Sequence, residues 1–136
     1  MIQLAHNDKT TTADTYRANL QTMIDGIRHR GGPPVLATPI VRHRFTDGKI
    51  NSTGLIVNSL GVDLPAEIRA VAAQRHVRLI DLTAKSQAML ESLGPAAEPI
   101  YLIREIGDRT HASEYGATIY AGMVADELRR YNLLVR

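Results

Sequence analysis

The chain contains three short apolar runs, and polar or turn-forming residues bound each of them. They span residues 2–5, 35–40 and 77–82. Their length and their content of β-branched side chains are typical of buried strands rather than of helices. The pattern therefore predicts three strands, the first of which begins directly after Met1.

Between and after these runs, apolar residues recur at the spacing of an amphipathic helix. The predicted helices cover residues 16–27, 64–72, 84–93 and 113–130. Asp63 is placed to cap the second helix, and glycines follow the first and the third. The last helix carries the clearest apolar stripe, formed by Ala117, Tyr120, Ala121, Val124, Ala125 and Leu128.

Strands that alternate with helices predict right-handed crossovers and a parallel sheet. A chain of 136 residues has the usual size of one domain, so we expect residues 1–136 to form a single domain of the α/β class. Residues 42–61 contain no firm element. Because they follow a strand, we expect them to form surface structure near a functional site.

The composition argues against several classes of site. The chain has 16 basic and 14 acidic side chains, one Phe and no Trp, so neither a basic stripe nor an aromatic stacking surface for nucleic acid is expected. It has no cysteine, which excludes disulfides, thiolate zinc sites and cysteine nucleophiles. No apolar run is long enough to cross a membrane, and the first residues lack the basic and apolar regions of an export signal. We expect neither nucleic acid nor membrane as a partner, and the compartment stays open.

Two polar segments are candidates for chemistry. Asn7 follows the first predicted strand, at the sheet edge where α/β proteins bind ligands, and its amide can donate to an oxyanion without carrying charge. Asp108 and His111 precede the last helix, and their spacing allows the carboxylate to accept from Nδ1 and leave Nε2 free as a base. The alternative is that both segments are ordinary turns, with Asn7 starting one and Asp108 capping the other.

A metal site is a further alternative. His6, Asp8, Asp108 and His111 offer the imidazole and carboxylate ligands that suit zinc or manganese. A carboxylate–imidazole pair explains Asp108 and His111 more simply. We therefore expect no metal and no other cofactor.

Several segments together resemble the rhamnogalacturonan acetylesterase branch of the SGNH (GDSL) hydrolase family. In chain order these are QLAHND at residues 3–8, VLATPIVRHRF at 35–45, VRLIDL at 77–82, ESLGP at 91–95 and GDRTHASEYGA at 107–117. Several blocks in the family's order make the resemblance more specific than any single motif. It implies a parallel-sheet, three-layer α/β/α fold of the flavodoxin-like SGNH type, lacking its first strands.

The resemblance also implies an activity, the serine-dependent removal of acetyl groups from a pectic polysaccharide. In that case His111 is the general base and acid, Asp108 orients it, and Asn7 is an oxyanion donor. Arg42 and Arg44 follow the second strand, and Arg42 becomes a candidate contact for a uronate carboxylate of the substrate. The alternative for these arginines is simple solvation on an exposed loop.

Two departures from the family pattern bear on activity. The glycine of the family's third block is Ala5 here. The Gly-Asp-Ser block with the nucleophile, and the glycine oxyanion donor of the second block, precede the third strand in the family and have no counterpart in this sequence. None of the serines present lies in a strand–turn–helix elbow: Ser52, Ser59, Ser86, Ser92 and Ser113. We therefore expect the isolated chain to be inactive.

Two hypotheses of different classes remain. In the first, the chain is the C-terminal portion of a carbohydrate esterase whose serine comes from a missing segment or a second chain. In the second, it is a nonenzymatic truncated remnant that folds or dimerises and at most binds carbohydrate. In either case the first strand lacks a neighbour on one side, so we expect a homodimer or a complex with a chain that supplies the missing N-terminal strands.

Overall fold

A computed structural model describes residues 1–103, 106–108 and 110–134. Its central sheet is parallel, in the order β1-β2-β5, and consists of β1 (Ile2–Gln3), β2 (Val35–Ala37) and β5 (Arg78–Ile80). Each strand falls within an apolar run that predicted it. The parallel pairing expected from the alternation of strands and helices is confirmed.

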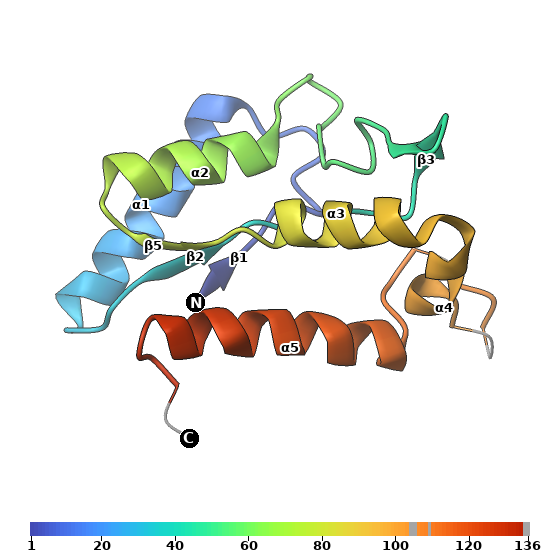
Figure 1. The fold of residues 1–136 in the computed structure, drawn as a ribbon. Helices are drawn as coiled ribbons and strands as arrows, with labels where there is room; N and C mark the ends of the chain where they lie inside the picture. The colour runs from blue at the N-terminus through green and yellow to red at the C-terminus, as the bar shows by residue number, and fades with distance from the viewer. Residues whose placement is uncertain (104–105, 109, 135–136) are drawn as a thin grey trace.

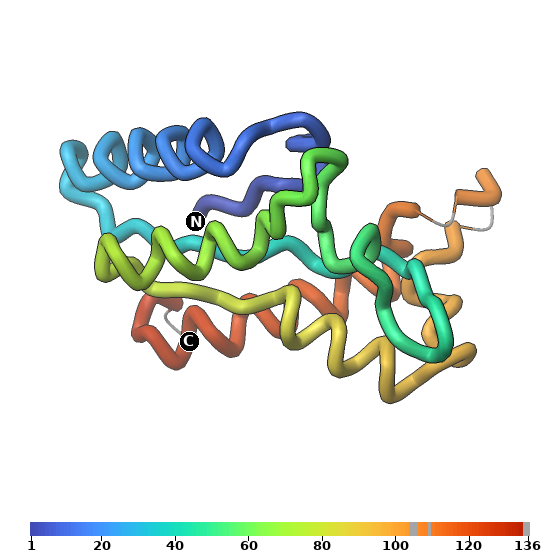
Figure 2. Tube along the Cα trace, turned by 90° about the horizontal axis from the view of Figure 1, so that it is seen from above, coloured from blue at the N-terminus to red at the C-terminus, as the bar shows by residue number. Residues whose placement is uncertain are grey.

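Helices cover both faces of this sheet. They are α1 (Ala13–His29), α2 (Leu64–Gln74), α3 (Leu82–Leu93), α4 (Glu98–Tyr101) and α5 (Glu114–Arg130), with a 3-10 turn at Gly94–Ala97 before α4. α1 and α2 lie side by side on one face, and α5 runs along the other (Figures 1 and 2). The predicted three-layer α/β/α arrangement is confirmed. Among the described residues, no helix combines the length and apolar character needed to span a membrane.

Alternate residues of β2 face opposite layers, as the pleat of a strand requires. Leu36 is fully buried and packs in one cluster with Leu20 of α1. Its neighbours Val35 and Ala37 belong to a second cluster, against which Val124 of α5 packs. Burying each large aliphatic side chain stabilises the fold by about 2 kcal/mol. The apolar character of β2 on both faces therefore holds all three layers together.

Side-chain caps determine where the four long helices begin. The capping residues, each of which accepts a backbone N–H of the first helical turn, are Thr12, Asp63, Asp81 and Ser113. The predicted cap at Asp63 is confirmed, with Ala66 N at 2.9 Å from its carboxylate. Such a cap is worth about 1 kcal/mol. The caps at Asp81 and Ser113 also fix the chain on both sides of the site described below.

Residues 42–61 contain a hairpin that periodicity does not predict. β3 (Phe45–Thr46) and β4 (Lys49–Ile50) pair antiparallel across Asp47 and Gly48. The φ angles of these two turn residues are 50° and 76°, the positive values that a tight hairpin turn requires. Each strand is only two residues long, which is too short to leave a visible alternation of polar and apolar positions.

The buried face of α5 is rotated from the predicted apolar stripe. Tyr120 is buried as expected, but Ala117 and Ala121 are exposed. The reason is a close approach at Gly116, where an added Cβ would lie 2.2 Å from the carbonyl oxygen of Ile100. Because only glycine fits against Ile100, this contact sets the rotation of the helix.

Candidate active site

The segments that leave β1 and β2 meet the loop before α5 at one hollow of about 550 Å³. It is lined by Gln3, His6, Asn7, Lys9, Ile40, Arg42, Thr110, His111 and Ala112. Three of the four residues to which the family resemblance gives a role, Asn7, Arg42 and His111, therefore share one cavity. Arg44 is not among its lining residues, and Arg109, within the block that resembles the family, lies outside the described residues.

The fourth residue, Asp108, lies directly behind His111. Its Oδ2 is 2.6 Å from Nδ1 of His111, so this nitrogen carries the proton that it donates to the carboxylate. The other oxygen accepts the backbone N–H of Thr110 at 2.6 Å and that of His111 at 3.3 Å. The hydrogen bond from His111 lowers the pKa of Asp108, and the N–H of Thr110 lowers it further. Nε2 of His111 is left with a lone pair to accept a proton.

Asn7 lies in a turn that begins at an unusual backbone position. Ala5 is buried and has a φ of 118°, a conformation that favours glycine. The N–H of Asp8 donates to the carbonyl of Ala5 at 3.0 Å and closes the turn. The chain leaving β1 is thereby redirected so that His6 and Asn7 line the hollow. Strained backbone of this kind is common at functional sites.

His6 links the exit of β1 to the exit of β2. Its Nε2 donates to the carbonyl of Ile40 at 3.0 Å, and its own carbonyl accepts a hydrogen bond of 2.8 Å from the guanidinium of Arg42. Burial lowers the pKa of His6, and nearby Arg42 and His111 act in the same direction, against the opposing effect of the bond to Ile40. His6 is therefore neutral at pH 7 and serves as a donor within the wall of the hollow.

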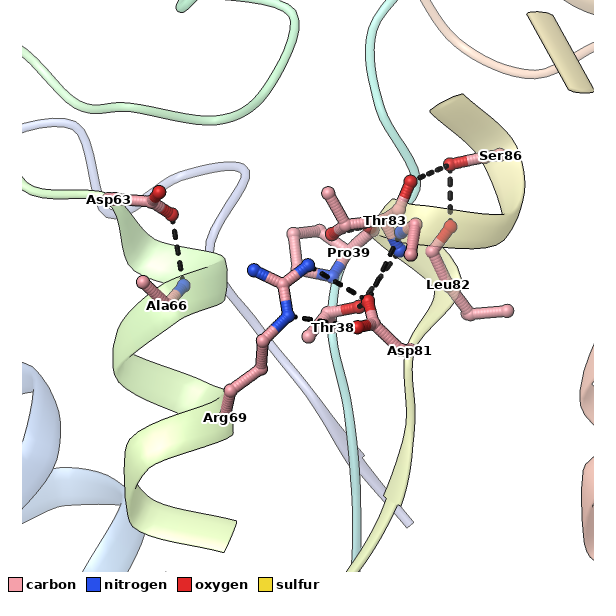
Figure 3. Close-up of polar contacts among 10 residues, drawn as sticks. Thr38, Pro39, Asp63, Ala66, Arg69, Asp81, Leu82, Thr83 and Ser86 are labelled. Carbon is pink, nitrogen blue, oxygen red and sulfur yellow. Dashed lines mark hydrogen bonds and ion pairs between the residues drawn. The ribbon is translucent and has the colours of Figure 1, made fainter. Parts of the chain in front are cut away.

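A network of polar side chains holds the segment after β2; we call it the strand-exit brace, and it consists of Thr38, Arg69, Asp81, Thr83 and Ser86 (Figure 3). Its centre is Asp81, which caps α3 and receives both ends of the Arg69 guanidinium at 2.8 and 3.0 Å. Partial burial alone would raise the pKa of Asp81, but the hydrogen bonds from Arg69, the α3 N-terminus and Thr38 outweigh it and lower the pKa.

The brace reaches the backbone as far as Val41. Thr83 donates to the carbonyl of Pro39 at 2.6 Å, and the N–H of Val41 donates to the buried Ser86 hydroxyl at 3.0 Å. The carbonyl of Val41 accepts from the phenol of the buried Tyr101. Since the main chain on both sides of Ile40 is held in this way, the position of Arg42 at the rim of the hollow is fixed by buried contacts.

All of the serines lie in the described residues. The hydroxyls of three of them donate hydrogen bonds to backbone carbonyls. The hydroxyl of Ser113 caps α5 and donates to the carbonyl of Pro99 at 2.6 Å. That of Ser59 donates to the carbonyl of Lys9, and that of Ser86 to the carbonyl of Leu82 at 2.6 Å. None of the serines lines the hollow that contains His111.

The four candidate metal ligands named from the sequence, His6, Asp8, Asp108 and His111, do not form a metal centre in the described structure. Within residues 1–103, 106–108 and 110–134, no group of three or more His, Cys, Asp or Glu side chains lies close enough together to hold a metal ion. His6 and Asp108 instead use their polar atoms for the hydrogen bonds described above.

Two features of the site are not predicted from the sequence. Lys9 lines the hollow only two residues after Asn7, and its position in the same block is the signal that would have pointed to it. The brace joins Thr38 to Asp81 across 43 positions of sequence, and no local pattern reveals such a contact.

Comparison with known proteins supports the family that the sequence blocks resemble. The chain is 30% identical to "Rhamnogalacturonan acetylesterase RhgT" of Bacillus subtilis (strain 168), in an alignment that covers 98% of this chain and 61% of RhgT. It is 31% identical to "Probable rhamnogalacturonan acetylesterase YesY" of the same organism, over 97% of this chain and 62% of YesY. Together these similarities support the assignment of the chain to the SGNH hydrolase family.

A solved structure supports the assignment to the SGNH family. The crystal structure of the Bacillus subtilis protein YxiM superimposes with a TM-score of 0.74 at 27% sequence identity, covering 96% of this chain and 36% of YxiM. No family model matches the sequence. The chain spans about three-fifths of the length of the two curated relatives, 61% and 62%.

Proposed function

We propose that residues 1–136 supply the acid–base side of a carbohydrate acetylesterase site that acts on an acetylated pectic polysaccharide. The observation that carries the proposal is the Asp108–His111 pair opening on a hollow that Asn7 also lines. The names of the two curated relatives, both rhamnogalacturonan acetylesterases, support this substrate class.

Each residue has one role in the proposed reaction. Nε2 of His111 takes the proton of a serine hydroxyl as the serine oxygen attacks the acetyl carbonyl, and then returns it to the sugar oxygen as the carbon–oxygen bond breaks. Water hydrolyses the acetyl-serine with the same histidine as base. Asp108 keeps the imidazole in the required tautomer, and the Asn7 amide donates to the oxyanion. Arg42, at the rim, contacts the polysaccharide.

The serine of this reaction lies outside residues 1–136. This part of the proposal is supported by the hydrogen bonds that occupy Ser59, Ser86 and Ser113 and by the absence of any serine from the lining of the hollow. We place the incoming segment beside β1, which in the described chain is paired with β2 alone. A preceding segment of the same protein, a second protein, or a second copy of this chain would each cover that edge.

The test is acetate release from acetylated rhamnogalacturonan by the protein produced from its complete reading frame. We expect His111→Ala to lower kcat by a factor on the order of a million, the loss typical when a serine hydrolase loses its base. The 136-residue chain alone should hydrolyse an aryl acetate no faster than its own His111→Ala variant.

Two outcomes would contradict the proposal. One is turnover by the isolated chain with a fluorophosphonate adduct on one of its own serines. The other is a complete protein that carries a reactive serine and releases no acetate, which would favour a folded remnant without activity.

A further inference from the structure

The Asn7 amide lines the hollow that contains His111 but makes no hydrogen bond to any residue that the structure describes. Asn7 is exposed, so packing does not fix the direction of its side chain. The backbone of the turn around it therefore decides where the amide points. That turn begins at the buried Ala5, whose φ of 118° is strained for a residue other than glycine. Strained backbone persists only where surrounding contacts hold it.

One side chain from a distant loop holds this turn. The amide nitrogen of Asn58 donates to the carbonyl of Asp8 at 3.1 Å and to that of Thr11 at 2.8 Å. The neighbouring residue adds a third bond, because the backbone N–H of Ser59 donates to the carbonyl of Lys9 at 3.0 Å. The loop before α2 thus holds three carbonyls of the segment that joins β1 to α1.

The Asn58 amide is itself oriented by its own loop. Its oxygen accepts the backbone N–H groups of Leu60 and Val62, both at 3.0 Å. A side-chain amide has two N–H donors and an oxygen that accepts two bonds, so its full capacity is used. Because the oxygen faces Leu60 and Val62, both N–H groups face the turn. The next residue, Asp63, caps α2 and ties the loop to the rest of the fold.

We propose that Asn58 is a positioning residue, which holds the turn after β1 so that the Asn7 amide faces the hollow beside His111. This inference rests on the proposed function and adds to it a residue that acts through Asn7. The alternative is that Asn58 stabilises its loop and has no bearing on Asn7. The two differ in what happens once Asn7 is removed, since a residue that acts only through Asn7 then has nothing left to position.

Asn58→Asp in the complete protein is the first substitution. It keeps an oxygen to accept from Leu60 and Val62, but it replaces the two N–H donors by an oxygen that the carbonyls of Asp8 and Thr11 repel. We expect kcat for acetate release to fall by about 10- to 100-fold, the loss typical of a misplaced catalytic group. KM should change little, because the loss concerns the transition state.

The deciding measurement repeats this substitution in a protein that already carries Asn7→Ala. In that protein Asn58→Asp should lower kcat by less than about twofold, because the donor that Asn58 positions is gone. If the two substitutions instead lower kcat independently, so that their factors multiply, the inference is overturned. A rise in KM at constant kcat would overturn it as well.

Asn51→Asp is the matched control, since it makes the same change in the same connection between β4 and α2. The Asn51 oxygen accepts from the N–H of Gly54 at 3.0 Å, and its amide donates to the hydroxyl of Thr46 rather than to the turn. It should leave kcat unchanged. Thermal melts show whether each variant folds, and the uncharged Asn58→Ala takes the place of Asn58→Asp in both proteins if the carboxylate prevents folding.

Hydrogen exchange in the 136-residue chain tests the positioning without any activity. The N–H of Asp8 donates to the carbonyl of Ala5 at 3.0 Å, so its exchange rate reports how often the turn opens. Asn58→Asp should speed this exchange at least about tenfold, and Asn51→Asp should not change it. Unchanged exchange in a folded Asn58→Asp chain would overturn the inference.

The proposed function fails separately. A complete protein that releases no acetate, or one whose kcat is the same after Asn7→Ala, would refute the proposed role of Asn7 whatever the exchange rates are. An active protein that requires Asn7 but keeps its kcat after Asn58→Asp would refute the positioning role alone.

Discussion

The two sides of the candidate site are held in different ways. The strand-exit brace joins residues that are far apart in the sequence, such as Thr38 and Asp81, through buried or half-buried hydrogen bonds. The loop that carries His111 is held locally, since among the described residues Asp108 bonds to those two and three positions away and to Ile103. The His111 side chain is 78% exposed.

Because of this difference, we expect the brace to contribute to the stability of the fold and the His111 loop to contribute to the proposed activity. A network of long-range buried contacts stabilises the whole fold, so changing it should lower the free energy of unfolding. An exposed local turn contributes little to global stability, so it can be changed with the fold intact. Substitutions on the two sides should therefore give opposite signatures, with lost activity from the loop and lost stability from the brace.

After His111→Ala, the largest effect is expected from Asp108→Asn in the complete protein. An asparagine retains the oxygen that accepts the N–H groups of Thr110 and His111, but its amide donates to Nδ1 and moves the imidazole proton to Nε2. We expect kcat for acetate release to fall by about 10⁴-fold with an unchanged melting temperature. Asp126→Asn, on the exposed face of α5, is the control. A small loss of kcat would mean that Asp108 does not orient the base.

A smaller loss of activity is expected from Asn7→Ala. The amide of Asn7 lies on the wall of the hollow that contains His111, and removing one oxyanion donor typically lowers kcat by about 10²–10³-fold. KM should change little, because the donor acts on charge that develops only in the transition state. A rise in KM at constant kcat would instead assign Asn7 to substrate binding.

On the brace side, Asp81→Ala should destabilise the fold by about 2–4 kcal/mol, from loss of the helix cap and of the charged hydrogen bonds. Denaturant unfolding measures this free energy directly. Asp126→Ala removes an exposed carboxylate that, within the described part of the chain, pairs with the exposed Arg129. Its effect should stay within about 0.5 kcal/mol. Equal effects of the two substitutions would remove the distinction between brace and surface.

The smallest effect concerns pH and His6. Burial lowers the pKa of His6 below its ordinary value of 6.5, so the unfolded chain binds the proton more readily than the folded one. The contribution of neutral His6 to stability is therefore complete above pH 6.5 and is lost as the pH falls from there through the folded-state pKa. His6→Gln, which keeps a donor for the carbonyl of Ile40, should flatten this decline in urea melts. Parallel curves for both proteins would show that His6 is not the group responsible.

Local patterns in the sequence predict the main strands and helices of this fold. They do not reveal contacts between residues that are far apart in the chain. Three strands, four helices and the cap at Asp63 follow from periodicity and end signals within a few residues. The β3–β4 hairpin is too short to show a period, and the rotation of α5 depends on its contact with Ile100. Asp108 and His111 are recognisable because their partnership spans only three positions, whereas the brace depends on pairs about 40 positions apart.

The proposed role of His111 depends on which of its ring nitrogens carries the proton. Nitrogen NMR of the 136-residue chain at about pH 8, where an ordinary imidazole is neutral, measures this directly and requires no nucleophile. The account predicts the proton on Nδ1, against Asp108, and a lone pair on Nε2, with Asp108→Asn moving the proton to Nε2. A proton on Nε2 in the wild-type chain would contradict it, because His111 would then have no lone pair to offer to the hollow.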